Sequence, residues 1–189
     1  MADTEPVLRE RGDAQLIEKA KAGDADAFGE LYERYAQVVF RFFSAHLDNW
    51  QDAEDLTEAT FLRFWRSLAN FQEKGVPFQA FLFRIARNGL IDHYRQIGRS
   101  GRSIPLDEGI PVRDQRPEPS ETVANNLEYQ EVREVLADLR EDYRTVLVLR
   151  FMSELSPEET GLVMGKTPGA VRVLQHRALA ALRNLLKES

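Results

Sequence analysis

Apolar positions along the chain recur every three or four residues, which is the spacing of amphipathic helices. The periodicity covers about residues 13–97 and again about residues 121–187. Breaks at Gly23-Asp24, near Asn49-Trp50-Gln51 and at Gly75-Val76-Pro77 divide the first stretch into separate helices. No run of alternating β-branched residues predicts a strand. The pattern therefore predicts an all-α protein.

The segment between the two helical stretches has the composition of a linker. Residues 98–120 hold three glycines and four prolines, a density that cannot sustain a helix. We therefore expect two helical domains joined by an extended linker. The expected division is an N-terminal tail (1–13), a larger domain (14–97), a flexible acidic linker (98–124) and a smaller domain (125–187).

Two short helices with a tight turn are predicted near the C-terminus. Ser156-Pro157-Glu158-Glu159 has the N-cap, first-turn proline and capping-box glutamate of a helix start. Thr160, Val163 and Met164 give this helix an inward side, and Gly165 suits the left-handed residue at its end. Thr167-Pro168 then starts a second helix in the same way. This arrangement is typical of a helix-turn-helix, and the segment 139–151 before it predicts a helix that packs behind it.

The second of these helices has an apolar stripe and a basic side. The stripe consists of Val171, Leu174, Ala178, Leu182 and Leu185. We expect the first turns to expose Arg172, Gln175, His176 and Arg177. Arginine can read guanine in the major groove and glutamine can read adenine. A plain helical hairpin with a solvated face has the same pattern, so this segment alone leaves both interpretations open.

The helix predicted over residues 52–71 has two distinct faces. The core face consists of Ala53, Leu56, Thr60, Phe64, Leu68 and Phe71. A second stripe combines carboxylates with large aromatics: Glu54, Glu58, Phe61 and Trp65. Such a mixture favours a protein interface, although Phe61 and Trp65 packed under a neighbouring helix would give the same spacing.

The helix predicted over residues 79–97 turns Leu82, Ile85, Ala86 and Gly89 inward. Its outer side carries Arg84, Asn88, Arg95 and Arg99, with Asp92 as the single acidic residue between 81 and 99. Phe71, Phe78 and Phe81 cluster just before it. Arginines beside aromatics suit single-stranded DNA, whose bases stack and whose phosphates are neutralised. A solvated arginine face is the alternative.

Charge is segregated along the chain, although the net charge is −6. Residues 61–104 contain 8 basic and 2 acidic side chains, and residues 143–189 contain 7 and 4. The basic blocks mark where a polyanion could dock, although an ordinary solvated helix surface gives the same charges. The first ~20 residues hold no apolar run of a signal peptide, and no apolar stretch reaches the ~18 residues of a membrane span. The absence of cysteine fits a reducing cytoplasm, where we expect the protein to work.

The C-terminal pattern resembles a known family. The run from Leu139 to Ala178, including Ser156-Pro157-Glu158-Glu159 and Gly169-Ala170-Val171-Arg172, is similar to the sigma-4 domain of extracytoplasmic-function (ECF) sigma factors. The resemblance implies that this domain reads the −35 promoter element. The implied DNA contacts are Thr167, Gly169, Ala170, Arg172, Gln175, His176 and Arg177. Leu174-Gln175 departs from the family, which usually has a polar residue followed by leucine.

The N-terminal pattern resembles the sigma-2 domain of the same family. Asp52-Ala53-Glu54-Asp55-Leu56-Thr57-Glu58, with Thr60-Phe61-Leu62-Arg63, is similar to the helix that grips the β′ clamp helices of RNA polymerase. The implied polymerase contacts are Asp55, Glu58, Phe61, Leu62 and Trp65. The run from Phe78 to Arg95 resembles the segment that reads and melts the −10 element, with the loop 72–79 capturing a flipped base. The implied −10 contacts are Phe78, Phe81, Arg84, Asn88 and Arg95.

The resemblance covers about residues 14–97 and 125–187 and implies a sigma-70-family subunit of the ECF group. Its implied partners are bacterial core RNA polymerase (the β′ clamp helices and the β subunit), promoter DNA and an anti-sigma factor. The linker would thread the nucleic-acid channel of the polymerase. Phe81 stands where tryptophan is commoner in the family, and Gly89 where a larger apolar residue is usual.

Three other classes of function fit the sequence less well. A stand-alone helix-turn-helix regulator explains residues 139–187 but not the two-faced helix. A helical adaptor does not predict the segregated basic blocks. A hydrolase using Glu54 and Glu58 lacks a histidine partner, a phosphate-binding glycine loop and a second carboxylate motif. We therefore expect no catalytic residue, no metal site, no cofactor and no membrane insertion.

Overall fold

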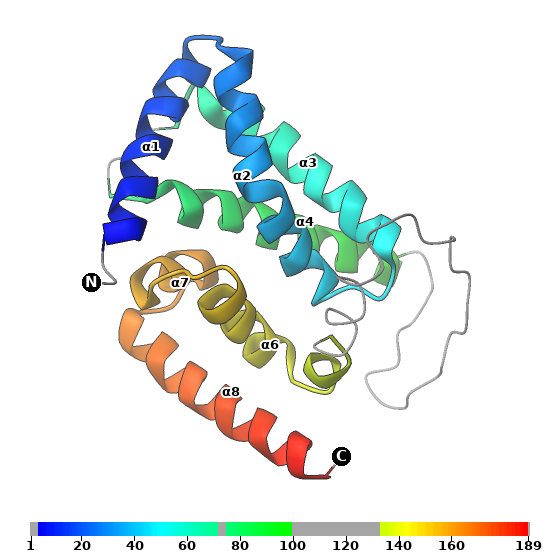
Figure 1. Cartoon of the computed structure of the whole chain (residues 1–189). Coiled ribbons are helices and arrows are strands. Elements are labelled where there is room, and N and C mark those ends of the chain that lie inside the picture. Colours follow the sequence, from blue (N-terminus) through cyan, green and yellow to red (C-terminus); the bar gives the residue numbers. More distant parts are fainter. Residues whose placement is uncertain (1–3, 72–74, 100–132, 189) are drawn as a thin grey trace, which may run out of the picture.

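The computed structural model of the chain describes residues 4–71, 75–99 and 133–188 (Figure 1). These residues form helices and their connections, with no strand among them, as the periodicity predicts. The expected linker (98–124) and the tip of the loop 72–79 lie almost wholly outside the described residues. The division into domains therefore stays a prediction.

Four helices make up the N-terminal region: α1 (Thr4–Lys21), α2 (Ala25–Ser44), α3 (Trp50–Leu68) and α4 (Phe78–Arg99). The breaks between them fall where the sequence predicts. Asp24 caps α2 by accepting hydrogen bonds from the backbone N–H groups of Asp26 and Ala27, at 3.0 and 3.1 Å. Helix α1 begins at Thr4, within the segment expected to be a tail. No apolar periodicity marks that first part of the helix, so the pattern could not find it.

The C-terminal region consists of a helical turn at residues 133–137, α6 (Glu141–Leu147), the π-helical turn η1 (Val148–Met152), α7 (Pro157–Met164) and α8 (Pro168–Glu188). The single helix expected over 139–151 is thus an α-helix that ends in a π-turn. The predicted signals of the helix-turn-helix are confirmed. Ser156 and Glu159 form a reciprocal capping box, and Gly165 ends α7 with φ 66°.

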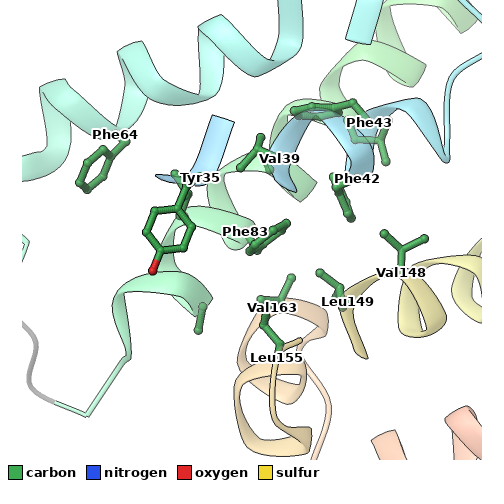
Figure 2. Close-up of a cluster of buried hydrophobic side chains, with 14 of the residues drawn as sticks. Tyr35, Val39, Phe42, Phe43, Phe64, Phe83, Val148, Leu149, Leu155 and Val163 are labelled. Atoms are coloured by element: carbon green, nitrogen blue, oxygen red, sulfur yellow. The ribbon is translucent and has the colours of Figure 1, made fainter. Parts of the chain in front are cut away.

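The two regions share one hydrophobic core. Helix α4 packs against α7, and α2 packs against η1. Figure 2 shows Phe42 and Phe83 of the N-terminal region facing Leu149 and Val163 of the C-terminal region, and all four are buried. The chain therefore folds with its two regions in direct contact rather than as separated units.

Polar groups also join the two regions. The backbone carbonyl of Asp48 accepts a hydrogen bond from Arg133 at 3.0 Å. The imidazole of His46, which is buried, lies 3.0 Å from the hydroxyl of Thr145 on α6. The Tyr94 hydroxyl of α4 donates to the His46 carbonyl at 2.7 Å, and burial raises the pKa of Tyr94 to about 12. These bonds place the end of α2 at the centre of the contact between the regions.

Candidate polymerase and nucleic-acid interfaces

The outer face of α3 presents apolar and acidic side chains together. Leu62 is 57% exposed and Trp65 is 40% exposed, while Glu58 and Asp55 lie exposed about one and two turns before Leu62. Within the part of the chain that the structure describes, neither carboxylate forms an ion pair. An exposed apolar patch beside unpaired carboxylates fits a partner surface that is basic at its rim.

Phe61 lies beneath the predicted interface. It is only 3% exposed, because it packs edge-on against Tyr32 of α2 with 4.8 Å between ring centroids. Trp65 packs in a similar way against Phe28, at 4.6 Å, but keeps one side in solvent. Phe61 therefore supports the surface from below and does not form it.

Tyr32 is a surface residue that the sequence reasoning missed. Its ring covers Phe61 and is itself 39% exposed beside the α3 face. It lies three positions before the buried Tyr35 in α2, so the sequence places it beside the apolar side of that helix. The sequence did not indicate that α3 packs beside Tyr32, because the two helices come together only in the folded chain.

The outer side of α4 carries the predicted polar residues. Arg84, Asn88 and Arg95 are exposed, whereas Leu82, Ala86 and Gly89 are buried as expected. The Arg84 guanidinium lies 5.5 Å from the centroid of the Phe81 ring, a cation–π contact.

Two of the predicted loop aromatics differ in their exposure. Phe78 is 4% exposed and packs on Tyr35 and Phe64, with ring centroids 5.1 and 5.2 Å away. It belongs to the core and offers no free face to a base. Phe81 is half-buried against Phe71, at 4.7 Å, and stays at the surface near the loop.

A hollow of about 260 Å³ lies beside this loop. Two of its lining residues, Gln79 and Asp13, are joined through Tyr35: Gln79 donates a hydrogen bond to the Tyr35 hydroxyl at 3.1 Å, and that hydroxyl donates to Asp13. The hollow is lined by Asp13, Gly75, Val76, Pro77, Phe78, Gln79 and Glu159. Glu159 comes from α7, so the C-terminal region forms part of its wall. Asp13 and Tyr35 were not among the predicted site residues, since only the packing of α1 on α2 brings them to the loop.

The exposed side of α8 holds most of the predicted −35 residues. Thr167 caps the helix, its hydroxyl accepting from the Ala170 N–H at 3.2 Å. The exposed positions are Thr167, Gly169, Ala170, Arg172, His176 and Arg177. Arg172 forms an ion pair with Glu158 of α7 at 2.9 Å, and both side chains are exposed.

Gln175 is less exposed than the sequence predicts. It is half-buried, and its side-chain oxygen accepts a hydrogen bond from Arg150 Nε at 3.0 Å. Arg150 also donates to the Leu155 carbonyl. The Gln175 side chain therefore connects α8 to the π-turn, and its oxygen already accepts a hydrogen bond.

The described residues contain no group of three or more histidine, cysteine, aspartate or glutamate side chains placed to hold a metal ion. None of the helices in these ranges has the length and apolarity needed to cross a bilayer.

These features define an all-helical protein with a helix-turn-helix and three exposed faces suited to macromolecular partners. Comparison with known families identifies it further. The family model described as Sigma-70 region 2 matches residues 31–100, and the one described as Sigma-70, region 4 matches residues 129–182. The chain belongs to the ECF sigma factors of the sigma-70 family of RNA polymerase subunits.

Two curated relatives illustrate this membership. The ECF RNA polymerase sigma factor ShbA of Streptomyces griseus is 33% identical over 180 residues, covering 92% of this chain and 94% of the relative. The ECF RNA polymerase sigma factor BldN of Streptomyces coelicolor is 36% identical over 174 residues, covering 92% of this chain and 66% of the relative. Among solved structures, CnrH in complex with the cytosolic domain of CnrY is 28% identical, with a TM-score of 0.73 over 94% of this chain and 99% of that one.

Proposed function

We propose that this chain binds bacterial core RNA polymerase and directs initiation at specific promoters as an ECF sigma factor. One observation carries the proposal: a single chain presents an acidic and aromatic face on α3, a basic face on α4 and a basic recognition helix, α8. A stand-alone regulator needs only the last of these. Their order along the chain is that of sigma region 2 followed by region 4.

The polymerase contact is the outer face of α3. Leu62 and Trp65 supply the apolar area, and Asp55 and Glu58 attract a basic partner such as the β′ clamp helices. Tyr32 extends this surface onto α2. Phe61 acts through Tyr32, by holding its ring in place.

The −10 contact combines α4 with the loop before it. Arg84 and Arg95 neutralise phosphates, Asn88 offers hydrogen bonds, and Phe81 provides a ring edge near the loop. The hollow beside the loop, lined in part by Gln79 and Asp13, has room for part of a flipped base. Flipping costs a few kcal/mol, which hydrogen bonds in such a hollow can offset.

The −35 contact is the exposed side of α8. Its N-terminal turns point backbone and side-chain donors outward, as the recognition helix of a helix-turn-helix does in the major groove. Arg172, His176 and Arg177 are the exposed basic and aromatic groups there, and Gly169 and Ala170 allow close approach of the backbone.

The protein performs no covalent chemistry in this proposal, because nucleotide addition belongs to the polymerase, and it works where the polymerase works, in the cytoplasm. We also propose control by an anti-sigma factor, since CnrH, a structural relative, is captured with the cytosolic domain of CnrY. Isolation of the tagged chain from its native cells should recover such a partner in stoichiometric amount. Recovery of the chain with polymerase alone under all growth conditions would contradict this part.

The decisive experiment measures binding of the full chain to core RNA polymerase. A Leu62→Ala, Trp65→Ala double variant should weaken binding at least tenfold with unchanged helicity, because two central apolar contacts are removed. The matched control is Trp50→Ala, which removes an exposed tryptophan (43%) from the other end of the same helix. A well-folded wild type that does not bind polymerase but shifts duplex DNA alone would replace the proposal with a stand-alone regulator.

A further inference from the structure

The recognition helix carries one large apolar side chain in the middle of its exposed side. Val173 is 52% exposed, while Val171 and Ala178 of the same helix are fully buried. With about 100° between successive residues, Val173 points roughly 150° away from the buried direction defined by those two residues. It is therefore on the far side of α8 from the core.

The neighbours of Val173 on this surface are exposed and mostly polar. Gly169, His176 and Arg177 lie within roughly 60° of it around the helix axis. An isolated exposed apolar residue usually needs no explanation. Here it lies on the exposed side between Arg172 and Arg177, two exposed arginines of the kind that contact phosphates.

Gln175, the residue that the sequence suggested as a base reader, faces elsewhere. By the same geometry it points roughly 160° from Val173, toward the buried side. Its oxygen accepts the hydrogen bond from Arg150, which is held in turn by the Leu155 carbonyl. Gln175 thus ties α8 to the π-turn η1 and leaves the centre of the exposed face to Val173.

We propose that Val173 is a specificity-determining residue that reads the 5-methyl group of a thymine in the −35 duplex. This rests on the proposed function, in which α8 enters the major groove. The thymine methyl is the apolar feature of base edges in that groove, and apolar side chains recognise it there. Valine suits this task because its branched side chain is short and has a restricted χ1 angle. It can neither donate to nor accept from the other bases.

The expected size of the effect follows from the single methyl group involved. Burial of one methyl is worth about a factor of four in affinity, so we expect a three- to tenfold preference for thymine over uracil at one position. Loss of the Val173 side chain should abolish this preference. It should leave the phosphate contacts, and hence the salt dependence of binding, unchanged.

The test uses holoenzyme assembled from the full chain and bacterial core RNA polymerase. A preferred −35 duplex is first selected from a randomised pool, and each of its thymines is then replaced singly by deoxyuridine, which lacks the methyl. Dissociation constants are measured for wild type, Val173→Ala and the control Leu186→Ala. Leu186 is also exposed and apolar (57%) but lies at the other end of α8. Thermal melts establish that both variants fold.

The supporting result is one thymine at which deoxyuridine weakens binding by wild type and Leu186→Ala three- to tenfold but leaves Val173→Ala unaffected. Equal uracil effects in all three proteins, or a selected element without thymine, would overturn the role of Val173 while leaving −35 recognition intact. A holoenzyme that selects no sequence at all would instead refute the proposed function of α8. The two failures are therefore distinguishable.

Discussion

His46 and Thr145, 99 residues apart in the sequence, share a buried hydrogen bond that joins the turn after α2 to α6. The Phe42 carbonyl, 2.7 Å from His46 Nδ1, can only accept, so Nδ1 carries the hydrogen. Nε2 is then the acceptor, 3.0 Å from the Thr145 hydroxyl that donates to it. Both side chains are buried, so neither group has water as an alternative partner.

Removal of this hydroxyl should destabilise the chain as a whole. Thr145→Val keeps the shape but leaves Nε2 of His46 unsatisfied, at a cost of about 1–3 kcal/mol, and Thr145→Ser should restore most of the loss. Both tryptophans, Trp50 and Trp65, lie in the N-terminal region. Urea unfolding monitored by tryptophan fluorescence therefore reports whether a substitution in α6 changes the stability of the N-terminal region. An unshifted tryptophan transition in Thr145→Val would show that the regions unfold independently.

The His46 imidazole also predicts a pH dependence of stability. Burial lowers the pKa of His46 to about 4, and the nearby charges of Arg144 and Arg87 act in the same direction. Below about pH 6.5 the His46 imidazole becomes protonated in the unfolded chain, whereas in the folded chain it stays neutral down to about pH 4. The free energy of unfolding should therefore fall by about 3 kcal/mol from this group as the pH drops across that window.

Unfolding of wild type and His46→Gln should be compared at pH 7 and pH 4. The carboxylates titrate in both proteins, so the difference between their two losses isolates the imidazole. Wild type should lose about 3 kcal/mol more than the variant. Equal losses would mean that folding does not lower the pKa of His46.

The turn of the helix-turn-helix predicts opposite effects at two glycines. A Cβ at position 161 would lie 2.5 Å from the Lys166 carbonyl oxygen, a backbone atom that cannot move aside without opening the turn. Gly161→Ala should therefore destabilise the chain by about 1–3 kcal/mol, as overpacked sites do. Gly169→Ala meets open space and should stabilise α8 by up to about 1 kcal/mol. Thermal melts of the two variants measure both; stabilisation by Gly161→Ala would refute the close approach.

The aromatics near the −10 loop should separate stability from promoter opening. Phe78→Ala removes a buried ring and should cost about 3–5 kcal/mol of stability. Phe81→Ala, at a half-buried position, should cost less while reducing the fraction of promoter opened by the holoenzyme. Permanganate reactivity of unpaired thymines measures opening, and urea titration measures stability. If Phe81→Ala opened promoters like wild type, Phe81 would have no place in the −10 contact.

Local features of the fold were predictable because their causes lie within a few residues of each other. The capping box of Ser156 and Glu159, the left-handed Gly165 and the core face of α3 each depend on spacing along one helix. The same holds for the buried stripe of α8 through Val171 and Ala178. These predictions are confirmed because tertiary packing did not oppose them.

The errors concern residues whose exposure is decided by a distant neighbour. Phe61 is buried because Tyr32 covers it, and Phe78 because Tyr35 and Phe64 enclose it. Gln175 is occupied because the π-turn brings Arg150 to it. The direct packing of α4 on α7 was also unforeseen, since helical periodicity identifies an apolar face but not what covers it.

The shared core of the two regions makes the separation between their basic faces a constant of the fold. The outer sides of α4 and α8 stay exposed while Phe83 and Val163 are buried between the regions. The packing of the two regions thus leaves both surfaces exposed and fixes the distance between them. A pair of promoter elements with any other spacing can be bound at once only after that core has opened. Opening exposes several buried apolar side chains, so the energy must come from a partner that binds the open form better. Spacer length and polymerase affinity would then be coupled quantities rather than independent ones.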